Sequence, residues 1–322
     1  MTERTFEYKD AELGHVSLLL SLVGPSFSGK TNSALRLATG IRQVTGGDIA
    51  LIDTENGRAT HYADEFKFKH LPFPAPFDPD SYLAALETCS KQGAKVVIVD
   101  SGSHCWESAG GVLESHETEL DRMAGNDWKK RERMNFAAWI KPKRAYNHLV
   151  NTMLQMNIHM IWCFRAKQKT SIKKGEKPAN LGFMSIAGSE MMYEFHLQAL
   201  LYPSSGGVPT WNSELPGERM MAKLPRQFEH IFKQSQPLSE DIGQQLAEWA
   251  AGDSKPAPPV EGLELQESPS ERLALVLAMI DHAPDRETLT RVAAENKDKD
   301  WEDAERATIR DRIKLRMSEL SK

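Results

Sequence analysis

The sequence of 322 residues has little cysteine: Cys89, Cys105 and Cys163 are the only three, and no two of them form a CxxC pair. An odd number of widely spaced cysteines argues against a disulfide framework and indicates a reducing cytoplasm. His159 and Cys163 have H-x3-C spacing, but no further ligands follow at a spacing typical of zinc sites. We therefore expect these side chains to pack in the core.

Long apolar runs are also missing. The longest run near the start, residues 16–23, is too short to span a bilayer and contains Ser17 and Ser21. The first ten residues, MTERTFEYKD, lack the basic, apolar and small-residue order of a signal peptide. We expect a cytoplasmic protein that makes no membrane contact.

An excess of positive charge is absent too, since 40 Lys and Arg face 45 Asp and Glu, a formal net charge of −5. The whole protein therefore offers nucleic acid no broad positive field, and any DNA contact must be local. The composition, 40% hydrophobic and 26% charged, is ordinary for a globular protein. The length suggests a core of roughly 200 to 250 residues with a small appendage.

Apolar segments alternate with helical patterns along the first 250 residues. This alternation predicts an α/β fold with a mostly parallel sheet, right-handed crossovers and helices on both faces. Residues 165–180 are polar, basic and punctuated by Gly and Pro, which predicts a loop. The predicted strands are 16–24, 48–53, 95–100, 158–164, 195–202 and 219–223, and the predicted helices are 30–40, 80–92 and 128–156.

The end of the chain has a different composition. Residues 251–268 are acidic and rich in Pro, as linkers are. Beyond them, 270–283, 286–296 and 301–320 show the pattern of three amphipathic helices. We predict a core over 1–250, a linker over 251–268 and a small helical domain over 269–322.

Between the first predicted strand and helix, residues 24–31 read GPSFSGKT and match the phosphate-binding loop G-x-x-x-x-G-K-[ST]. Such a loop points backbone N–H groups at the β-phosphate, and the following helix adds a favourable dipole. Lys30 is expected to reach the β- and γ-phosphates, and the Thr31 hydroxyl to ligate Mg²⁺. The predicted nucleotide contacts are Gly24, Pro25, Ser26, Phe27, Ser28, Gly29, Lys30, Thr31 and Asn32.

The third predicted strand, KVVIVD, ends in Asp100. An acidic residue after an apolar strand and downstream of a phosphate loop is typical of the Walker B carboxylate, which holds Mg²⁺ through water. We expect Asp100 and Thr31 to form the metal site, with help from the Ser101 hydroxyl. The predicted cofactors are ATP and Mg²⁺.

The second predicted strand ends in LIDTEN, residues 51–56, and a carboxylate at its end together with the G-P-x-x-S-G-K-T loop resembles RecA and Rad51. The resemblance covers residues 14–250 and implies a RecA-like P-loop ATPase core. It implies that Glu55 is the catalytic glutamate, which orients or deprotonates the attacking water. Glu107, seven residues after Asp100, is the alternative base.

The same resemblance places a γ-phosphate sensor after the fourth strand. Arg165 occupies that place, and Gln168 is the second choice. A basic segment follows where RecA-type proteins carry a DNA-binding loop, and it predicts contacts with single-stranded DNA. Its lysines are Lys167, Lys169, Lys173, Lys174 and Lys177.

Two more basic groups are candidates. Lys223 and Arg226 follow the last predicted strand, where RecA-like rings and filaments present basic residues to a neighbour's nucleotide, so self-association is expected. Residues 128–139 carry basic residues between two tryptophans, and here we favour a solvated helix face with buried tryptophans over a DNA track. The group consists of Lys129, Lys130, Arg131 and Arg133, with Trp128 and Trp139.

Taken together, the pattern is most similar to the phage-encoded RecA-like ATPases of DNA recombination and single-strand annealing, which implies the cytoplasm of a host cell. The resulting hypothesis is an ATPase stimulated by single-stranded DNA. The alternative is an ATP-dependent loader or switch whose C-terminal helices recruit a replication or recombination protein without touching DNA. A small-molecule kinase ranks last, because no arginine-rich lid follows the core helices.

Overall fold

The computed structural model describes residues 16–171, 178–232 and 235–252, and further on residues 273, 276–277, 280–281, 286–297, 301 and 303–320. The chain divides into two compact units, Met1–Ala257 and Pro258–Lys322, which are treated separately below. The division falls within the predicted linker, most of which lies outside the described residues.

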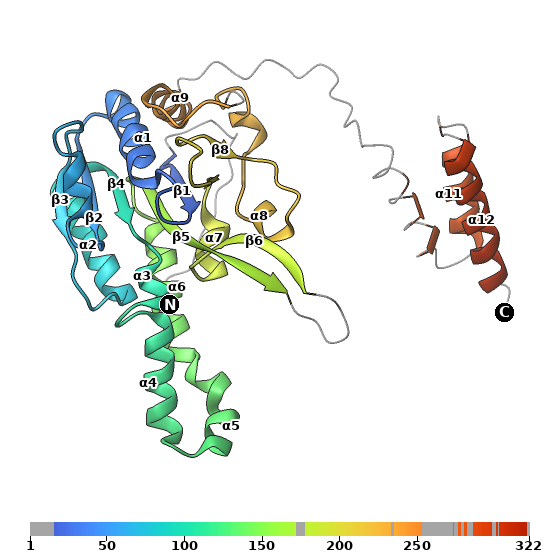
Figure 1. Cartoon of the computed structure of the whole chain (residues 1–322), viewed down its shortest axis with the longest axis horizontal. Coiled ribbons are helices and arrows are strands. Elements are labelled where there is room, and N and C mark those ends of the chain that lie inside the picture. The colour runs from blue at the N-terminus through green and yellow to red at the C-terminus, as the bar shows by residue number, and fades with distance from the viewer. Residues whose placement is uncertain are drawn as a thin grey trace, which may run out of the picture. The chain divides into compact units, whose positions relative to one another are not determined.

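The first unit is built on one eight-stranded sheet (Figure 1). The strands are β1 Leu19–Gly24, β2 Asp48–Asp53, β3 Lys69–Pro72, β4 Ala94–Asp100, β5 His159–Ser171, β6 Ala179–Ser185, β7 Leu197–Leu201 and β8 Pro209–Thr210. The helices are α1 Lys30–Thr45, η1 Arg58–Tyr62, α2 Pro79–Lys91, α3 His104–Glu107, α4 Val112–Ala124, α5 Trp128–Ala138, α6 Ile140–Met153, α7 Ser189–Glu194, α8 Pro216–Arg219, η2 Arg226–Phe228 and α9 Glu240–Ala250.

The strand order is β3-β2-β4-β5-β1-β7-β8, with β6 paired to the outer part of β5. Pairs within β3-β2-β4-β5-β1-β7 are parallel, whereas β5–β6 and β7–β8 are antiparallel. The predicted α/β class with a mostly parallel sheet is therefore confirmed. Because β5 lies between β1 and β4, the carboxyl ends of these three strands meet at one edge of the sheet.

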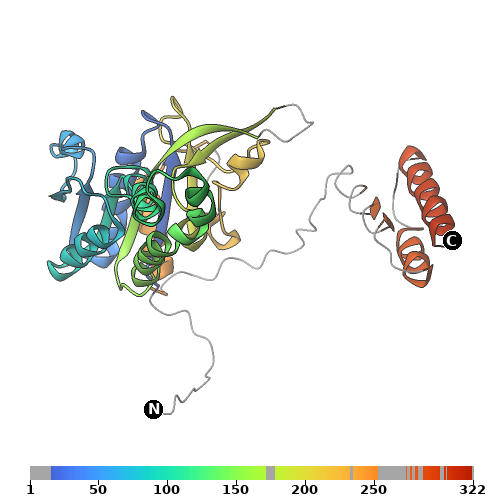
Figure 2. The same ribbon diagram turned by 90° about the horizontal axis from the view of Figure 1, so that it is seen from below.

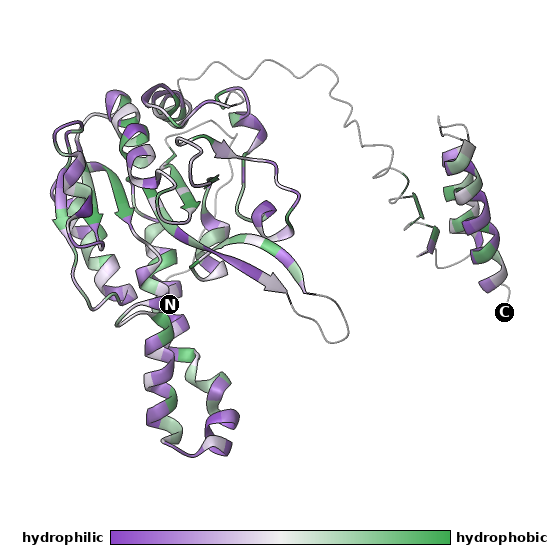
Figure 3. Cartoon of the chain, viewed as in Figure 1, coloured by the Kyte–Doolittle hydropathy of each residue, from purple (hydrophilic) through white to green (hydrophobic). Residues whose placement is uncertain are grey.

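Helices cover both faces of the sheet, as the continuous apolar strands require. On one face α1 and α9 pack on alternate strand residues such as Leu20, Leu22 and Ile98. On the other face α2, α6 and α7 pack on the residues in between, such as Val97, Val99 and Trp162. In Figure 3 the central strands are accordingly hydrophobic, whereas α4 and α5 are mostly hydrophilic.

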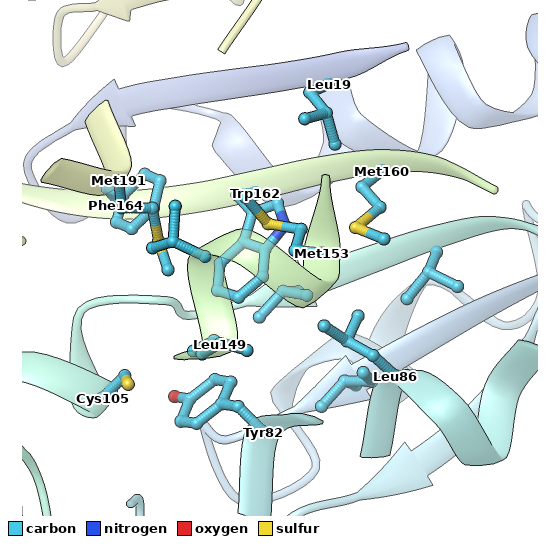
Figure 4. Close-up of a cluster of buried hydrophobic side chains, with 14 of the residues drawn as sticks. Leu19, Tyr82, Leu86, Cys105, Leu149, Met153, Met160, Trp162, Phe164 and Met191 are labelled. Atoms are coloured by element: carbon cyan, nitrogen blue, oxygen red, sulfur yellow. The ribbon is translucent and has the colours of Figure 1, made fainter. Parts of the chain in front are cut away.

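Trp162 of β5 lies in the apolar layer between the sheet and the helices α2, α6 and α7 (Figure 4). Its ring stacks on Tyr82 of α2 and on Phe164, each with centroids 6.0 Å apart. Cys105 lies in the same cluster, and all three cysteines are free and buried, as expected. This layer fixes β5 and β4 side by side beneath the predicted nucleotide site.

Helix α1 runs to Thr45, five residues beyond the predicted end at Gly40. Gly40 is not a helix terminator here but the point where α9 crosses α1. A Cβ atom at Gly40 would lie 1.8 Å from the Glu240 carbonyl oxygen, and one at Gly243 of α9 would lie 2.2 Å from the Leu37 carbonyl oxygen. The two glycines let the backbones of α1 and α9 approach closely.

Two predictions about the later part of the core are wrong. Residues 165–171 are not a loop, because β5 continues to Ser171 and pairs with β6 in a ribbon that extends beyond the other strands (Figure 2). Lys167, Gln168 and Lys169 are all exposed, so no apolar alternation marks the strand. Residues 219–223 are not a strand: α8 ends at Arg219, and only an isolated bridge joins Lys223 to Gln198.

Other elements differ from the prediction in extent. The predicted helix 128–156 is divided at Trp139 into α5 and α6. Helix α4, which the sequence did not reveal, packs against α5 and forms a hairpin with it that extends away from the sheet (Figure 1). Strand β3 was missed as well, since KHLP is short, polar and ends in proline.

The second unit contains the helices α11 Arg286–Lys297 and α12 Asp303–Glu319. Its buried side chains include Ile280, Leu289, Val292, Trp301 and Ile309. In the described residues of either unit, no helix is both long enough and apolar enough to cross a membrane.

Candidate nucleotide-binding site

The predicted phosphate loop joins β1 to α1 and has the backbone that anion binding needs. Gly29, in the left-handed region at φ 83°, caps α1, and no side chain caps the first turn. A helix start without a side-chain cap leaves N–H groups and the positive end of the dipole for an anion. Gly24 is required by packing, since a Cβ atom there would lie 2.3 Å from the Leu201 carbonyl oxygen.

Lys30 folds back over this loop. Its ammonium donates to the carbonyl oxygens of Gly24 at 2.9 Å and Pro25 at 2.8 Å, with the Ser28 hydroxyl at 3.4 Å. Burial lowers the pKa of Lys30, while the nearby thiol and carboxyl groups, including Asp100, act against this shift. The ammonium group is thus held at the phosphate loop by hydrogen bonds to backbone carbonyl oxygens.

Thr31 and Asp100 come together as predicted for a metal site. The Thr31 hydroxyl donates to Asp100 Oδ2 at 2.6 Å. Burial raises the pKa of Asp100 to about 6, although the hydrogen bond from Thr31 opposes the shift. A cation between these oxygens would favour the carboxylate, and a hydroxyl with a carboxylate suits Mg²⁺, which prefers oxygen ligands.

The Glu55 carboxylate lies between two arginines. Arg165 donates to Glu55 Oε1 from Nη2 at 2.7 Å and from Nε at 3.0 Å. Arg58 Nη1 donates to Oε2 at 3.2 Å. Burial opposes ionisation of Glu55, but the two guanidinium groups outweigh it and lower its pKa. The carboxylate is therefore ionised at neutral pH.

The buried Asp53 positions the segment that carries Glu55. Asp53 Oδ1 accepts from the Glu55 backbone N–H at 2.7 Å, and Oδ2 accepts from the Ala59 N–H at 3.2 Å. His70 Nε2 of the β3 segment lies 3.0 Å from Oδ2. A carboxylate with three donors fixes the turn after β2, and hence the place of Glu55.

A second set of hydrogen bonds joins the ends of β2 and β4. The Ser101 N–H donates to the Thr54 hydroxyl at 2.7 Å, and His104 Nδ1 lies 2.7 Å from the same oxygen. The Arg165 N–H donates to the Ser103 hydroxyl at 2.9 Å, which ties β5 to the same place. Ser101 therefore takes part by hydrogen bonding, through its backbone N–H and through its hydroxyl, which accepts from the Ser103 N–H at 3.2 Å.

These groups enclose one cleft of about 380 Å³. The structure thus brings together Lys30, Thr31, Glu55, Asp100 and Arg165, which sequence analysis selected separately. Three of the predicted nucleotide contacts, Gly24, Pro25 and Asn32, do not belong to this lining. The residues that line the cleft are Ser26, Phe27, Ser28, Gly29, Lys30, Thr31, Glu55, Arg58, His61, Tyr62, Asp100 and Arg165.

Arg58, His61 and Tyr62 are lining residues that the sequence did not reveal. They lie on η1, which begins after Gly57 in the left-handed region at φ 85°. A helical turn of five residues is too short to show hydrophobic periodicity in the sequence. Its position shortly after Glu55 was the only available signal. Two aromatic rings beside a phosphate loop are suited to contact a nucleotide base.

The alternative base and the basic ribbon lie elsewhere. Glu107 is 3.6 Å from Lys167 Nζ and does not line the cleft. Gln168 and Lys169 are exposed on β5, in the ribbon that starts at Arg165. The other predicted DNA contacts, Lys173, Lys174 and Lys177, lie outside the described residues.

Lys223 and Arg226 do not line the cleft of their own chain. The Lys223 ammonium donates to the Phe195 carbonyl oxygen at 2.6 Å, so this side chain supports the end of α7. Arg226 begins η2. Their predicted contact with a neighbouring subunit stays a prediction.

The basic group on α5 is only partly the solvated face that we favoured. Arg131 is paired with Glu117 and Asp121, and Trp139 packs on the core and stacks on His116 with centroids 4.1 Å apart. Trp128, however, is 67% exposed and not buried, because α5 contacts α4 and α6 and not the sheet.

Among the described residues, no group of three or more His, Cys, Asp or Glu side chains is arranged to hold a metal ion. A metal held by Thr31 and Asp100 would need further oxygens from a phosphate or from water. The search against protein-family models gives no match to the chain, and no curated protein is significantly similar to it.

Proposed function

We propose that the protein is a Mg²⁺-dependent ATPase with a RecA-like core that acts on single-stranded DNA in recombination or annealing, as phage-encoded ATPases of this kind do. The observation that carries the proposal is the common cleft. The phosphate loop, the Thr31–Asp100 pair, Glu55 and Arg165 come from four neighbouring strands or the segments that follow them, and they line one space of about 380 Å³.

The strand order supports a RecA-like arrangement. Strand β5 lies between β1, which leads into the phosphate loop, and β4, which ends in Asp100. Because β5 is the neighbour of β1, Arg165, at the end of the buried part of β5, lies beside the start of the phosphate loop. Gly24 pairs with Arg165 in register, so a sensor of the terminal phosphate has the expected position.

The chain's own groups suit hydrolysis of a nucleoside triphosphate. Lys30 exchanges its carbonyl partners for β- and γ-phosphate oxygens, which is a charge-assisted contact. Thr31 and Asp100 would hold Mg²⁺, which would supply charge that neutralises the phosphate oxygens. The rings of His61 and Tyr62 contact the base.

Glu55 and Arg165 act together in this scheme. Arg165 is the nearer of the two cations at the Glu55 carboxylate, at 2.7 Å against 3.2 Å for Arg58. A γ-phosphate beside Arg165 competes for the guanidinium and leaves Glu55 to orient the attacking water. Glu55 is already ionised, so its activity as a base depends on losing a hydrogen-bond partner and not on titration.

Single-stranded DNA is the proposed partner because β5 continues past Arg165 into the ribbon that carries Lys167 and Lys169. A contact between these lysines and DNA phosphates is made on the same strand as the sensor. Movement of Arg165 on nucleotide binding is thereby coupled to the ribbon.

The test is ATP hydrolysis with and without single-stranded DNA, at low and at higher salt, with Lys30→Ala as the blank. We expect stimulation by DNA that requires Lys30 and falls as salt rises, because phosphate contacts release counterions. Basal hydrolysis without stimulation would contradict the DNA role. The net charge of −5 would then favour the alternative, a loader that acts on a protein partner.

A further inference from the structure

A second large depression, of about 820 Å³, lies in the first unit away from the nucleotide cleft. Its walls come from the α5–α6 junction, β5 and β6, α7 and the segment after α8. Figure 1 shows that the hairpin of α4 and α5 and the ribbon of β5 and β6, which flank this groove, both extend away from the sheet.

Large apolar side chains of the groove are exposed to solvent. Phe136 is 88% and Ile140 61% exposed at the α5–α6 junction, and Tyr193 of α7 is 67% and Met220, after α8, 57% exposed. These four are among the few exposed large apolar residues of the described chain, and all four line this one groove. A cluster of this kind marks a binding site.

Basic side chains lie in the groove and on the helix beside it. Lys169 lines the groove, and among the described residues it has no ion pair with a carboxylate. Lys143, which also lines the groove, is paired with Glu190 at 3.2 Å. Lys129 and Arg133 are not lining residues, but with Phe136 they follow each other at spacings of four and three, so the three share one face of α5. Lys129 Nζ lies 5.5 Å from the centre of the Trp128 ring.

We infer that this groove holds single-stranded DNA, with bases stacked on Phe136 and Tyr193 and phosphates along Lys129, Arg133 and Lys169. Exposed aromatic rings and nearby cations are the two elements of sequence-independent binding to single strands. A helix from a partner protein could pack on the apolar side chains of the groove. It would pair with the cations only if it were acidic. The inference rests on the proposed function, since it names where the DNA lies.

The test is fluorescence anisotropy of a labelled oligo(dT) with the full chain, comparing wild type, Phe136→Ala, Tyr193→Ala and the double variant. Each substitution should weaken binding at least about fivefold, because stacking of one base on one ring has this effect or more. Arg133→Glu should weaken binding and reduce its salt dependence. Leu154→Ala, 43% exposed and outside the groove, and Lys91→Glu, on α2, are the matched controls and should bind as wild type does.

An abasic oligonucleotide of equal length separates stacking from charge. It should bind wild type more weakly than oligo(dT), and Phe136→Ala should weaken it no further. Because both rings are mostly exposed, the variants should melt at the wild-type temperature. Normal DNA binding by the double variant would overturn the groove but leave the ATPase proposal intact. Failure of wild type to bind oligo(dT), with binding of polyglutamate instead, would overturn both the groove assignment and the DNA role.

Discussion

The contacts of Glu55 bear most directly on the proposed hydrolysis of ATP. Its carboxylate accepts from Arg165 and Arg58 and lines the same cleft as Lys30 and the Thr31–Asp100 pair. A free carboxylate near a terminal phosphate would repel it, and the two cations remove this repulsion. The same contacts keep Glu55 ionised, which is the form that a general base needs.

Glu55→Gln should retain tight MgATP binding and lose hydrolysis by at least about a hundredfold, because general-base catalysis contributes that much or more. The measurement is a single-turnover assay together with nucleotide binding. Glu107→Gln is the matched control, since Glu107 pairs with Lys167 outside the cleft and should leave the rate unchanged. Hydrolysis by Glu55→Gln at the wild-type rate would exclude Glu55 as the base.

The sequence was sufficient for residues whose position is fixed by a motif or a strand end. Lys30 and Thr31 follow from the loop pattern, and Asp100, Glu55 and Arg165 each follow an apolar strand, so parallel strands bring them to one edge. The lining by Tyr62 could not be predicted, because it depends on a short turn. Nor could the role of Asp53, which depends on three hydrogen bonds to other segments.

At the scale of elements, the contact between α1 and α9 joins the phosphate-loop helix to the end of the core. Gly40 and Gly243 allow the two backbones to touch. Arg36 of α1 and Glu240 at the start of α9 add an ion pair at 2.8 Å. The position of α1, and with it the phosphate loop, thus depends on a helix that begins about 200 residues later.

Gly40→Ala tests this contact with a clear sign. In a free helix the change would stabilise by about 1 kcal/mol, because Ala is the better helix former. Here the added Cβ meets the Glu240 carbonyl, so we expect a loss of about 1 to 3 kcal/mol in the free energy of unfolding. Urea denaturation measures it, with Thr39→Ala as the neighbouring control. Increased stability of Gly40→Ala would contradict the close approach.

Two of the strand segments that the sequence did not reveal bury little of their surface. The outer part of β5 has exposed residues on both faces, and three of the four residues of β3 are exposed. Hydrophobic periodicity reports burial, so such segments leave no pattern. The ribbon that flanks the proposed DNA groove is of this kind.

At the scale of the whole molecule, the site and both core layers belong to the first unit. All residues that line the cleft lie between Ser26 and Arg165, and the unit extends to Ala257. A chain that ends at residue 257 should therefore fold and bind MgATP with the affinity of the full chain. Calorimetric titration checks this expectation, and a tenfold loss of affinity would show that the second unit takes part in the site.

The alternation of strands and helices was the reliable signal at this scale, since it predicted the mostly parallel sheet. The two-unit division follows a change of composition near residue 251. Recruitment of a replication or recombination protein by the helices of the second unit stays a prediction. Self-association through Arg226 stays a prediction as well.

The cleft beside the phosphate loop is the proposed MgATP site. The most direct test is an equilibrium titration of wild type and Lys30→Ala with a fluorescent ATP analogue, with and without Mg²⁺. We expect saturable, Mg²⁺-dependent binding by wild type and binding at least about tenfold weaker in Lys30→Ala, because charge-assisted contacts to phosphate are lost. Equal binding by the two proteins, or no binding by wild type, would contradict the account.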